Sequence, residues 1–524
     1  MTNVVVKGGQ FITLVDLTTL ILTIVAIVVF HIFVQWFCHT QLKRPPGPFP
    51  IWPLLGNLFL LGKIPHQDLY KLSKTYGDIM ELKLGSVRVV IISSPQMAEH
   101  VLKTHDHLLA YRPKSIISQS ISYGGLTMAF ASQAGDYWRR LRMIHASELL
   151  NANSLRASKN VRDEEISSLV HDYFQDCKEE KPMDIYTRSR NASLNVMTRL
   201  LFGKRYLGSG LSIKECEEFS DIINEETKIL GVFNISDFVP LLKPFDLQGI
   251  IPRLNNIRLK VDQFFDKIIE NHSREKSSNR SKDFLDVMFS FVESYGFGKK
   301  HGDNVIKAVI NEILEGSTET SITAIEWALA ELLKHPKFMK KAQDELDDVI
   351  GQDRIVDESD ILQLKYLQAI VKETLRLHPP APLMVPHQNM EACEIGGYHI
   401  LPKTQIFVNI WAIHRHSSAY ENPLEFNPDR FLQTNVDLKG KHFELLPFGS
   451  GRRICPGMLL GLLIVQMQLA RLLHSFTWKL PKGENPQDMD MGEVYGTTTR
   501  KAIPLRAIAI ARLPQHLYLA PQFT

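Results

Sequence analysis

One cysteine lies in a glycine-rich segment just before a strongly apolar stretch, and this segment constrains the fold most. Residues 447–457 read Pro-Phe-Gly-Ser-Gly-Arg-Arg-Ile-Cys-Pro-Gly. A thiolate at a helix N-terminus is stabilised by unpaired backbone N–H groups, so we expect a lowered cysteine pKa. The glycines allow a flat ligand to approach, the arginine offers a cation, and the phenylalanine shields the sulfur, which together suit haem iron. The candidate residues are Cys455 as metal ligand, and Phe448, Gly451, Arg453 and Gly457.

Composition and charge exclude several classes of protein. The 524 residues include 60 basic and 57 acidic side chains, and 44% of them are hydrophobic. This is the composition of a globular protein, and the near-neutral balance offers no electrostatic footprint for nucleic acid. The five cysteines lie far apart without a CxxC pair, which argues against a zinc site or a disulfide framework and favours a reducing compartment.

An uncharged run of 22 residues near the N-terminus, 17–38, predicts a membrane anchor. A helix of this length rises about 33 Å and crosses a hydrocarbon core. The alternative, a buried core helix, rarely reaches this length uninterrupted. Asp16 precedes the run, and Lys43 and Arg44 follow it, so the positive-inside rule places the rest of the chain in the cytosol. We expect a lumenal segment at 1–16, a single transmembrane helix at 17–38, a basic, proline-rich hinge at 39–50 and one large domain at 51–524.

The large domain is expected to be mainly α-helical with small β-sheets, an α+β class. Apolar periodicity and flanking prolines predict helices, and short β-branched runs beside glycines predict strands. The expected helices are 303–335, 360–378 and 458–474, and the expected strands are 79–84, 87–92, 395–400 and 505–510. The longest helix carries a polar insert around Gly316, where glycine costs about 1 kcal/mol relative to alanine. Periodicity leaves open whether this insert is a functional cleft or a kink.

The cysteine segment resembles the signature of the cytochrome P-450 superfamily. It matches F-x-x-G-x-R-x-C-x-G at every fixed position. The resemblance implies the cytochrome P-450 fold with an N-terminal transmembrane helix, and haem b, iron protoporphyrin IX with the thiolate of Cys455 as axial ligand. Trp138 and Arg142 match another motif of this family, W-x-x-x-R. The resemblance implies that both side chains reach the haem propionates.

Two further motifs of this family occur in the expected order. Glu373 and Arg376 match E-x-x-R, and Arg430 in FNPDRF would complete a structural triad with them. Glutamate and arginine three residues apart share one helix face. We expect this triad to stabilise the core around the cysteine loop rather than to contact substrate.

The same resemblance gives the polar insert a role. The pattern [AG]-G-x-[DE]-T-[TS] aligns with residues 316–321, which makes Glu319 and Thr320 the acid–alcohol pair that relays protons during oxygen activation. The chain departs from the pattern at Ser317, and at Glu315, where an apolar or small residue is usual. Successive helical residues lie 100° apart, and the sequence leaves open which way Glu315 points and whether either departure alters oxygen activation or coupling.

The resemblance also implies four substrate-contact segments, at 115–130, 310–320, 381–385 and 495–499. Their composition predicts a largely apolar pocket, and nothing in them fixes a charged group that would clamp an acidic substrate. The candidate pocket residues are Ile313, Gly316, Leu383, Met384 and Val385.

These features predict a monooxygenase, an oxidoreductase that uses O2 and NADPH electrons to hydroxylate a small hydrophobic molecule. The sequence has no GxGxxG loop or flavin domain, so NADPH–cytochrome P-450 reductase is the expected electron donor, at the endoplasmic reticulum membrane. The pattern is most similar to plant microsomal A-type enzymes, among them conifer terpenoid oxygenases and flavonoid hydroxylases. We favour a terpenoid of specialised metabolism as substrate, with a flavonoid or other phenolic ring as the alternative. A reductase-independent haem-thiolate isomerase or dehydratase, or a non-catalytic haem carrier, fits the Glu319–Thr320 pair less well.

Overall fold

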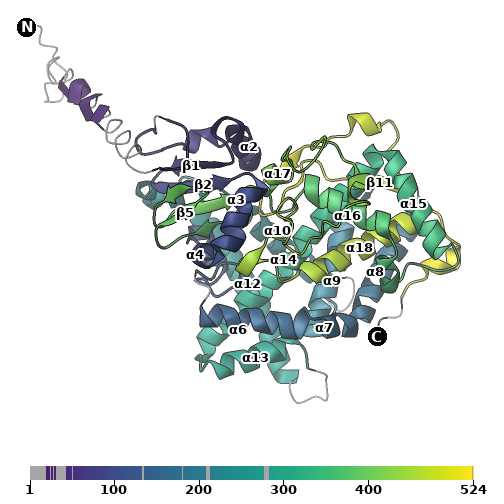
Figure 1. The fold of residues 1–524 in the computed structure, drawn as a ribbon. Coiled ribbons are helices and arrows are strands. Elements are labelled where there is room, and N and C mark those ends of the chain that lie inside the picture. Colours follow the sequence, from purple (N-terminus) through teal and green to yellow (C-terminus); the bar gives the residue numbers. More distant parts are fainter. Residues whose placement is uncertain are drawn as a thin grey trace, which may run out of the picture.

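The computed structural model describes residues 19–23, 25–27, 29–30, 43–49, 51–132, 135–179, 181–207, 213–275, 282–521 and 523. Helices dominate this part of the chain, and small sheets lie at its margins (Figure 1). The helices are α2 (Pro65–Tyr76), α3 (Pro95–Glu99), α4 (Asp106–Leu109), α5 (Ile116–Ile121), α6 (Asp136–Ile144), α7 (Ala152–Ala157), α8 (Lys159–Cys177), α9 (Ile185–Phe202), α10 (Ile213–Leu230), α11 (Ile235–Phe238), α12 (Ile250–Glu275), α13 (Phe284–Ser294), α14 (Lys299–Lys334), α15 (Pro336–Ile350), α16 (Lys365–Leu377), α17 (Ile410–Ile413) and α18 (Met458–Ser475). The predicted α+β class is confirmed.

The largest sheet in the described residues has the order β1-β2-β7-β4. β1 and β2 form the hairpin that the sequence predicts, and β2 pairs in parallel with β7. The turn requires Gly85, because its φ is +58° and an added Cβ would lie 2.2 Å from the carbonyl oxygen of Phe238. The strands are β1 (Ile79–Leu84), β2 (Val87–Ile92), β3 (Met183–Asp184), β4 (His387–Gln388), β5 (Cys393–Ile395), β6 (Tyr398–Ile400), β7 (Gln405–Val408), β8 (Phe476–Lys479), β9 (Glu493–Val494), β10 (Arg500–Lys501) and β11 (Arg506–Ala511).

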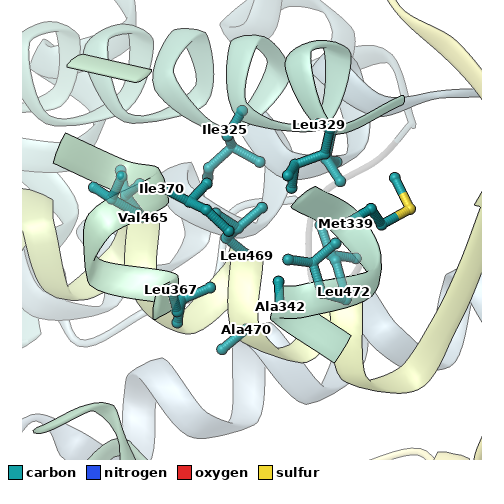
Figure 2. Close-up of a cluster of buried hydrophobic side chains, with 14 of the residues drawn as sticks. Ile325, Leu329, Met339, Ala342, Leu367, Ile370, Val465, Leu469, Ala470 and Leu472 are labelled. Atoms are coloured by element: carbon teal, nitrogen blue, oxygen red, sulfur yellow. The ribbon is translucent and has the colours of Figure 1, made fainter. Parts of the chain in front are cut away.

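Helix α14 runs through the centre of the molecule and packs against α9, α13, α16 and α18 (Figure 1). Residues 321–330 of α14 are all buried, as expected for a helix that is surrounded on every side. Figure 2 shows the cluster in which α14, α15, α16 and α18 interlock. Its labelled members are Ile325, Leu329, Met339, Ala342, Leu367, Ile370, Val465, Leu469, Ala470 and Leu472.

The polar insert does not interrupt α14, which continues from Lys299 to Lys334. The hydroxyls of Thr320 and Ser321 donate to the carbonyls of Gly316 and Ser317, four residues earlier, at 2.9 and 3.0 Å. Side-chain hydroxyls that bond back to the helix in this way are satisfied without a break in the ladder. The helix is therefore continuous through its polar turn.

Two predicted elements differ in their bounds. The helix expected at 360–378 begins at Lys365, because Asp357 caps a separate 3-10 turn, Glu358–Leu362. The strand expected at 395–400 is two short strands, β5 and β6, joined at Gly396 and Gly397, which both have positive φ. Local capping and turn chemistry decides both boundaries.

Most of the predicted anchor, 17–38, lies outside the described residues. Those described between 19 and 30 are helical, and their apolar side chains are exposed, Leu22 and Phe30 at 68% each. They project away from the body of the molecule on the side of β1 and β2 (Figure 1). Among the described residues, α18 is long and apolar enough to span a membrane, but it is mostly buried and serves as a core helix.

The three residues of the predicted triad contact one another. Arg376 donates to both carboxylate oxygens of Glu373, at 2.7 and 2.8 Å, and both side chains are fully buried. Arg430 donates to Glu373 at 3.1 Å. Arg376 also donates to the carbonyls of His414 and Pro423, so the triad ties α16 to the irregular segment that leads to the cysteine.

Replacing Glu373 with alanine should lower the free energy of unfolding by ~3–5 kcal/mol, because it leaves the Arg376 guanidinium buried without its anion. Chemical denaturation of the holoenzyme measures this loss. The matched control is Glu99→Ala, which breaks an exposed pair with Lys103 and should cost ~0.2–1 kcal/mol. Equal losses for the two variants would contradict a structural role for the triad.

Candidate functional site

Cys455 lies between a 3-10 turn, Gly451–Arg453, and the first residue of α18, Met458. Its backbone N–H donates to the carbonyl of Phe448 at 2.9 Å, which closes the loop. The side chain is half-buried. Burial raises the pKa of the Cys455 thiol, and the backbone N–H of Gly457 and the charge of Arg142 only partly oppose this. The predicted lowering of this pKa is therefore wrong for the ligand-free thiol, because desolvation outweighs the helix terminus.

The glycines of the loop have different roles from one another. Gly451 has φ +70°, and an added Cβ would lie 2.2 Å from the carbonyl oxygen of Leu102 and 3.0 Å from the carboxyl of Asp106. Gly451 therefore permits close packing on this neighbouring segment, not the approach of a flat ligand that the sequence suggested. An added Cβ on Gly457 would lie 4.0 Å from the Cys455 sulfur, so this glycine leaves space beside the thiol.

Helix α14 leaves one of its turns open inside the molecule. Gly316 is exposed, although Glu315 and Thr318 beside it are buried, and an added Cβ on Gly316 would meet no atom within 4 Å. Ile313 and Thr320 are half-buried and lie near this face, three and four residues away. One residue beyond Thr320, α14 lies close to α18, because an added Cβ on Gly461 of α18 would lie 3.9 Å from the hydroxyl of Ser321. The open space therefore lies beside the helix that follows the cysteine loop.

Trp138, Arg142 and Arg453 gather beside the cysteine loop. Arg453 donates to the carbonyls of Ala110, Met128 and Ala131 at 2.7–2.9 Å. Trp138 also donates to the carbonyl of Met128, at 3.0 Å, and Arg142 donates to that of Ile454, at 3.0 Å. Neighbouring backbone carbonyls thus position all three side chains that the sequence assigned to the cofactor.

Arg112 and His387 join this cluster, and the sequence reasoning missed both. Arg112 donates to the carbonyls of Val385 and Ala129, and burial and Arg453 lower its pKa to about 9. The Nδ1 atom of His387 lies 2.8 Å from the carbonyl oxygen of Leu109, and its Nε2 has no partner in the described residues. Burial and the charge of Arg112 lower the pKa of His387. The only signal in the sequence that could have pointed to this pair was that Arg112 directly precedes a proline.

The acid and the alcohol of the polar insert point to different neighbours. Thr320 faces the open turn, whereas Glu319 is only 2% exposed. Tyr186 on α9 donates to the Glu319 carboxylate, and Arg500 on β10 lies 3.7 Å from the same oxygen. Arg500 also donates to the Tyr186 hydroxyl at 2.6 Å. The second carboxylate oxygen of Glu319 has no hydrogen-bond partner among the described residues.

Hydrogen bonds link the predicted substrate-contact segments to one another. Glu312 on α14 accepts the backbone N–H groups of Met128 and Ala129 at 2.7 and 2.6 Å, which joins this helix to the 115–130 segment. Burial raises the pKa of Glu312 to about 7. The N–H of Thr499 donates to the carbonyl of Pro380 at 2.9 Å and so ties the 495–499 segment to the residue that directly precedes the 381–385 segment.

The three pocket candidates of the 381–385 segment differ in their surroundings. Leu383 is buried in the core cluster beneath β1 and β2. Met384 and Val385 are half-buried. The terminal methyl of Met384 would lie 2.8 Å from a Cβ on Gly449, so Met384 reaches the cysteine loop and Leu383 does not belong to the same surface.

These residues fit an iron porphyrin. The half-buried thiol is a soft axial donor, and the open turn of α14 leaves space for a flat ring. Arg112, Arg142 and Arg453 form no ion pair with a carboxylate in the described residues, and His387 has a free ring nitrogen. Two carboxylates on the ring would offset this buried positive charge.

The comparisons with known proteins agree with this geometry. The cytochrome P450 family model matches residues 45–505. A flavonoid 3′,5′-hydroxylase of Crocosmia x crocosmiiflora is 41% identical over 492 residues, 91% of this chain and 93% of that protein. A flavonoid 3′-monooxygenase of Arabidopsis thaliana is 39% identical over 513 residues, 96% of this chain and 99% of that protein. A solved zebra fish cytochrome P450 with progesterone superimposes with a TM-score of 0.72 at 24% identity, over 86% of this chain and 99% of that chain. The chain is a member of the cytochrome P450 family, a haem-thiolate monooxygenase that uses O2 and acts on a small molecule.

Proposed function

We propose that this monooxygenase hydroxylates an aromatic ring of a flavonoid or a related phenolic compound. The observation that carries the proposal is the similarity to several flavonoid hydroxylases along almost the whole of both chains. The terpenoid substrate that we favoured from the sequence motifs has no such support. The relatives therefore favour the phenolic alternative.

In this proposal, the thiolate of Cys455 would bind the haem iron. When bound, haem supplies the activation of O2 and the transfer of one oxygen atom to a C–H bond. Arg112, Arg142 and Arg453, with Trp138 and His387, would hold the haem propionates, and Gly457 leaves room beside the sulfur. Backbone carbonyls already orient the guanidinium groups, so little reorganisation is needed on binding.

Thr320 and Glu319 deliver protons to the open turn of α14. The Thr320 hydroxyl donates to the carbonyl of Gly316, so its lone pairs are free to accept a hydrogen bond, and its proton passes to the cavity side when the hydroxyl rotates away from that carbonyl. Glu319 is held by Tyr186 and Arg500, close in sequence to Thr320 but on the adjacent face of the helix. A water molecule or a rotation of the carboxylate connects the two groups, as general acid–base relays require.

The protein is anchored in the endoplasmic reticulum membrane and takes electrons from NADPH–cytochrome P-450 reductase. Residues 1–16, 17–38, 39–50 and 51–524 form the lumenal segment, anchor, hinge and catalytic domain. Exposed apolar side chains on both sides of the β1–β2 turn support a membrane-facing surface. They are Trp52, Leu54, Phe59, Leu241, Phe245 and Leu247. The turn joins the two groups, since Gly85 donates to the carbonyl of Leu55 and Ser86 to that of Phe238.

The membrane-bound enzyme with reductase and NADPH should convert apigenin, a trihydroxylated flavone, to a product with one more hydroxyl on an aromatic ring. Mass spectrometry identifies this product, and an incubation without NADPH is the control. Oxygen consumption coupled to hydroxylation of a terpenoid, with no product from apigenin or other flavonoids, would overturn the proposed substrate class.

Replacing Cys455 with alanine should abolish the absorption band of the reduced carbonyl complex that is characteristic of haem-thiolate proteins, because no thiolate remains at the iron. The matched control is Cys177→Ala, which removes another half-buried thiol, one that donates to the carbonyl of Phe174. An unchanged spectrum for the Cys455 variant would show that another residue binds the iron.

Replacing Thr320 with alanine should increase the peroxide released per NADPH several-fold and lower product formation to a similar degree, because the variant lacks the hydroxyl that relays protons to the open turn of α14. The control is Ser321→Ala, because Ser321 makes the same kind of bond to the helix but is buried near Gly461 of α18. If both variants retain the wild-type ratio of product to peroxide, Thr320 is not in the relay.

A further inference from the structure

Three polar side chains meet between α10 and α14 without enough hydrogen-bond partners. Glu226, Asn311 and Glu315 are 2%, 1% and 9% exposed. The amide nitrogen of Asn311 donates to one carboxylate oxygen of Glu226 at 2.9 Å. In the described part of the chain, the other oxygen of Glu226, the Asn311 amide oxygen and one oxygen of Glu315 have no partner. Buried polar atoms are nearly always paired, so three such atoms in one place indicate a missing partner.

The protonation of this cluster favours a neutral ligand. Burial raises the pKa of Glu226 to about 7, and burial together with the charges of Glu226, Glu319 and Glu312 raises that of Glu315 well above its usual value. Burial therefore favours the protonated, neutral form of Glu315. Protonated carboxyls and an amide both donate and accept hydrogen bonds, as hydroxyl groups do.

Among the described residues, Arg258 is the cation whose charge acts on Glu226, and it is already engaged. Arg258 on α12 interacts with Glu226 at longer range. Its guanidinium donates to the carbonyl of Ser120 at 2.8 Å and to Asp262 at 3.1 Å, and it lies over the ring of Tyr123. Arg258 therefore does not neutralise Glu315, and an anionic ligand would meet the carboxyls of Glu226 and Glu315 first.

The cluster borders the space where substrate is expected. Glu315 directly precedes Gly316, whose added Cβ would meet no atom within 4 Å. The carbonyl of Thr227, next to Glu226, accepts from the hydroxyl of Thr497 at 3.1 Å. The end of α10 therefore rests on the 495–499 segment, which is one of the four expected substrate-contact segments. Helix α10 itself was not among them.

We propose that Glu226, Asn311 and Glu315 form a polar subsite that hydrogen-bonds the hydroxyl groups of a polyhydroxylated aromatic substrate. This inference rests on the proposed function and specifies it, because it says how an otherwise apolar pocket recognises a phenolic compound. The glutamate that departs from the family pattern thus points towards α10, where it contributes to substrate recognition rather than to oxygen activation.

Two ligand pairs test the subsite in the full-length holoenzyme. Apigenin and flavone share one skeleton, but flavone carries no hydroxyl group. Carvacrol and p-cymene are a second such pair, on a terpenoid skeleton. Dissociation constants come from the spin-state change in the absorption spectrum. Wild-type enzyme should bind apigenin ~10-fold more tightly than flavone, as expected for two neutral hydrogen bonds.

Replacing Glu315 with leucine should reduce this preference to ~2-fold or less, through weaker binding of apigenin and unchanged or tighter binding of flavone. Glu315→Gln should keep most of the preference, because an amide also donates and accepts. The matched control is Glu326→Gln on the same helix, whose carboxyl already accepts the N–H of Leu505 at 2.8 Å, and it should leave both constants unchanged.

Thermal unfolding provides a readout that does not depend on turnover. In the absence of ligand, Glu315→Leu should raise the unfolding temperature, because it removes a buried polar group without a partner. Added apigenin should stabilise the wild-type holoenzyme more than it stabilises this variant. A lower unfolding temperature for the ligand-free variant would show that Glu315 has a structural partner and would overturn the subsite.

The outcomes separate the subsite from the proposed function. Ring hydroxylation of apigenin without any preference for hydroxylated ligands overturns the subsite and leaves the function standing. A preference for carvacrol over p-cymene that is lost in Glu315→Leu, without turnover of apigenin, supports the subsite and overturns the flavonoid substrate. Equal losses in the leucine and glutamine variants would mean that a charge is required, which contradicts recognition of neutral hydroxyls. If none of the four ligands changes the spin state, that result counts against both the subsite and the proposed function.

Discussion

Positive charge that is buried or half-buried and forms no ion pair in the described residues is the constraint on which the rest of the structure depends. Arg112, Arg142 and Arg453 lie together beside the cysteine loop, and their hydrogen bonds go to backbone carbonyls rather than to carboxylates. Carbonyl oxygens orient a guanidinium but do not cancel its charge. An anionic cofactor does, so its binding also stabilises the fold. The cysteine loop, the 110–131 segment and the 381–385 segment are thereby held around a common centre.

Helix α14 combines stability and function in one element. Its C-terminal half is buried on every side and anchors the core shared with α15, α16 and α18. Its middle turn instead contains a glycine that faces open space and buried carboxyls without full sets of partners, Glu315 and Glu319. Such features cost folding free energy, and proteins retain them where a ligand or a reaction requires them. The stabilising contacts of the C-terminal half offset the free-energy cost of the middle turn.

Much of the fold could be predicted because its signals are local. The β1–β2 hairpin, α14 and α18 follow from short apolar runs, from glycine and proline positions and from periodicity. Errors occurred where capping decides a boundary, as at Asp357. The site was harder, because its members come from distant segments. Arg112, His387, Tyr186 and Glu226 carry no motif of their own, and only packing brings them to the cysteine loop or to the polar turn.

The sequence by itself determined the family, and it pointed to the cysteine for iron and to the proposed acid–alcohol pair, because short motifs with fixed spacing carry that chemistry. Only the tertiary structure decided how these groups are surrounded. Burial raises the pKa of Cys455 although a helix begins beside it. Gly451 serves packing against Leu102, and Glu315 is buried, where the charge of Glu226 on α10 acts on its carboxyl. Desolvation, close backbone approach and pairing across helices depend on distances between residues far apart in the chain, which no local pattern encodes.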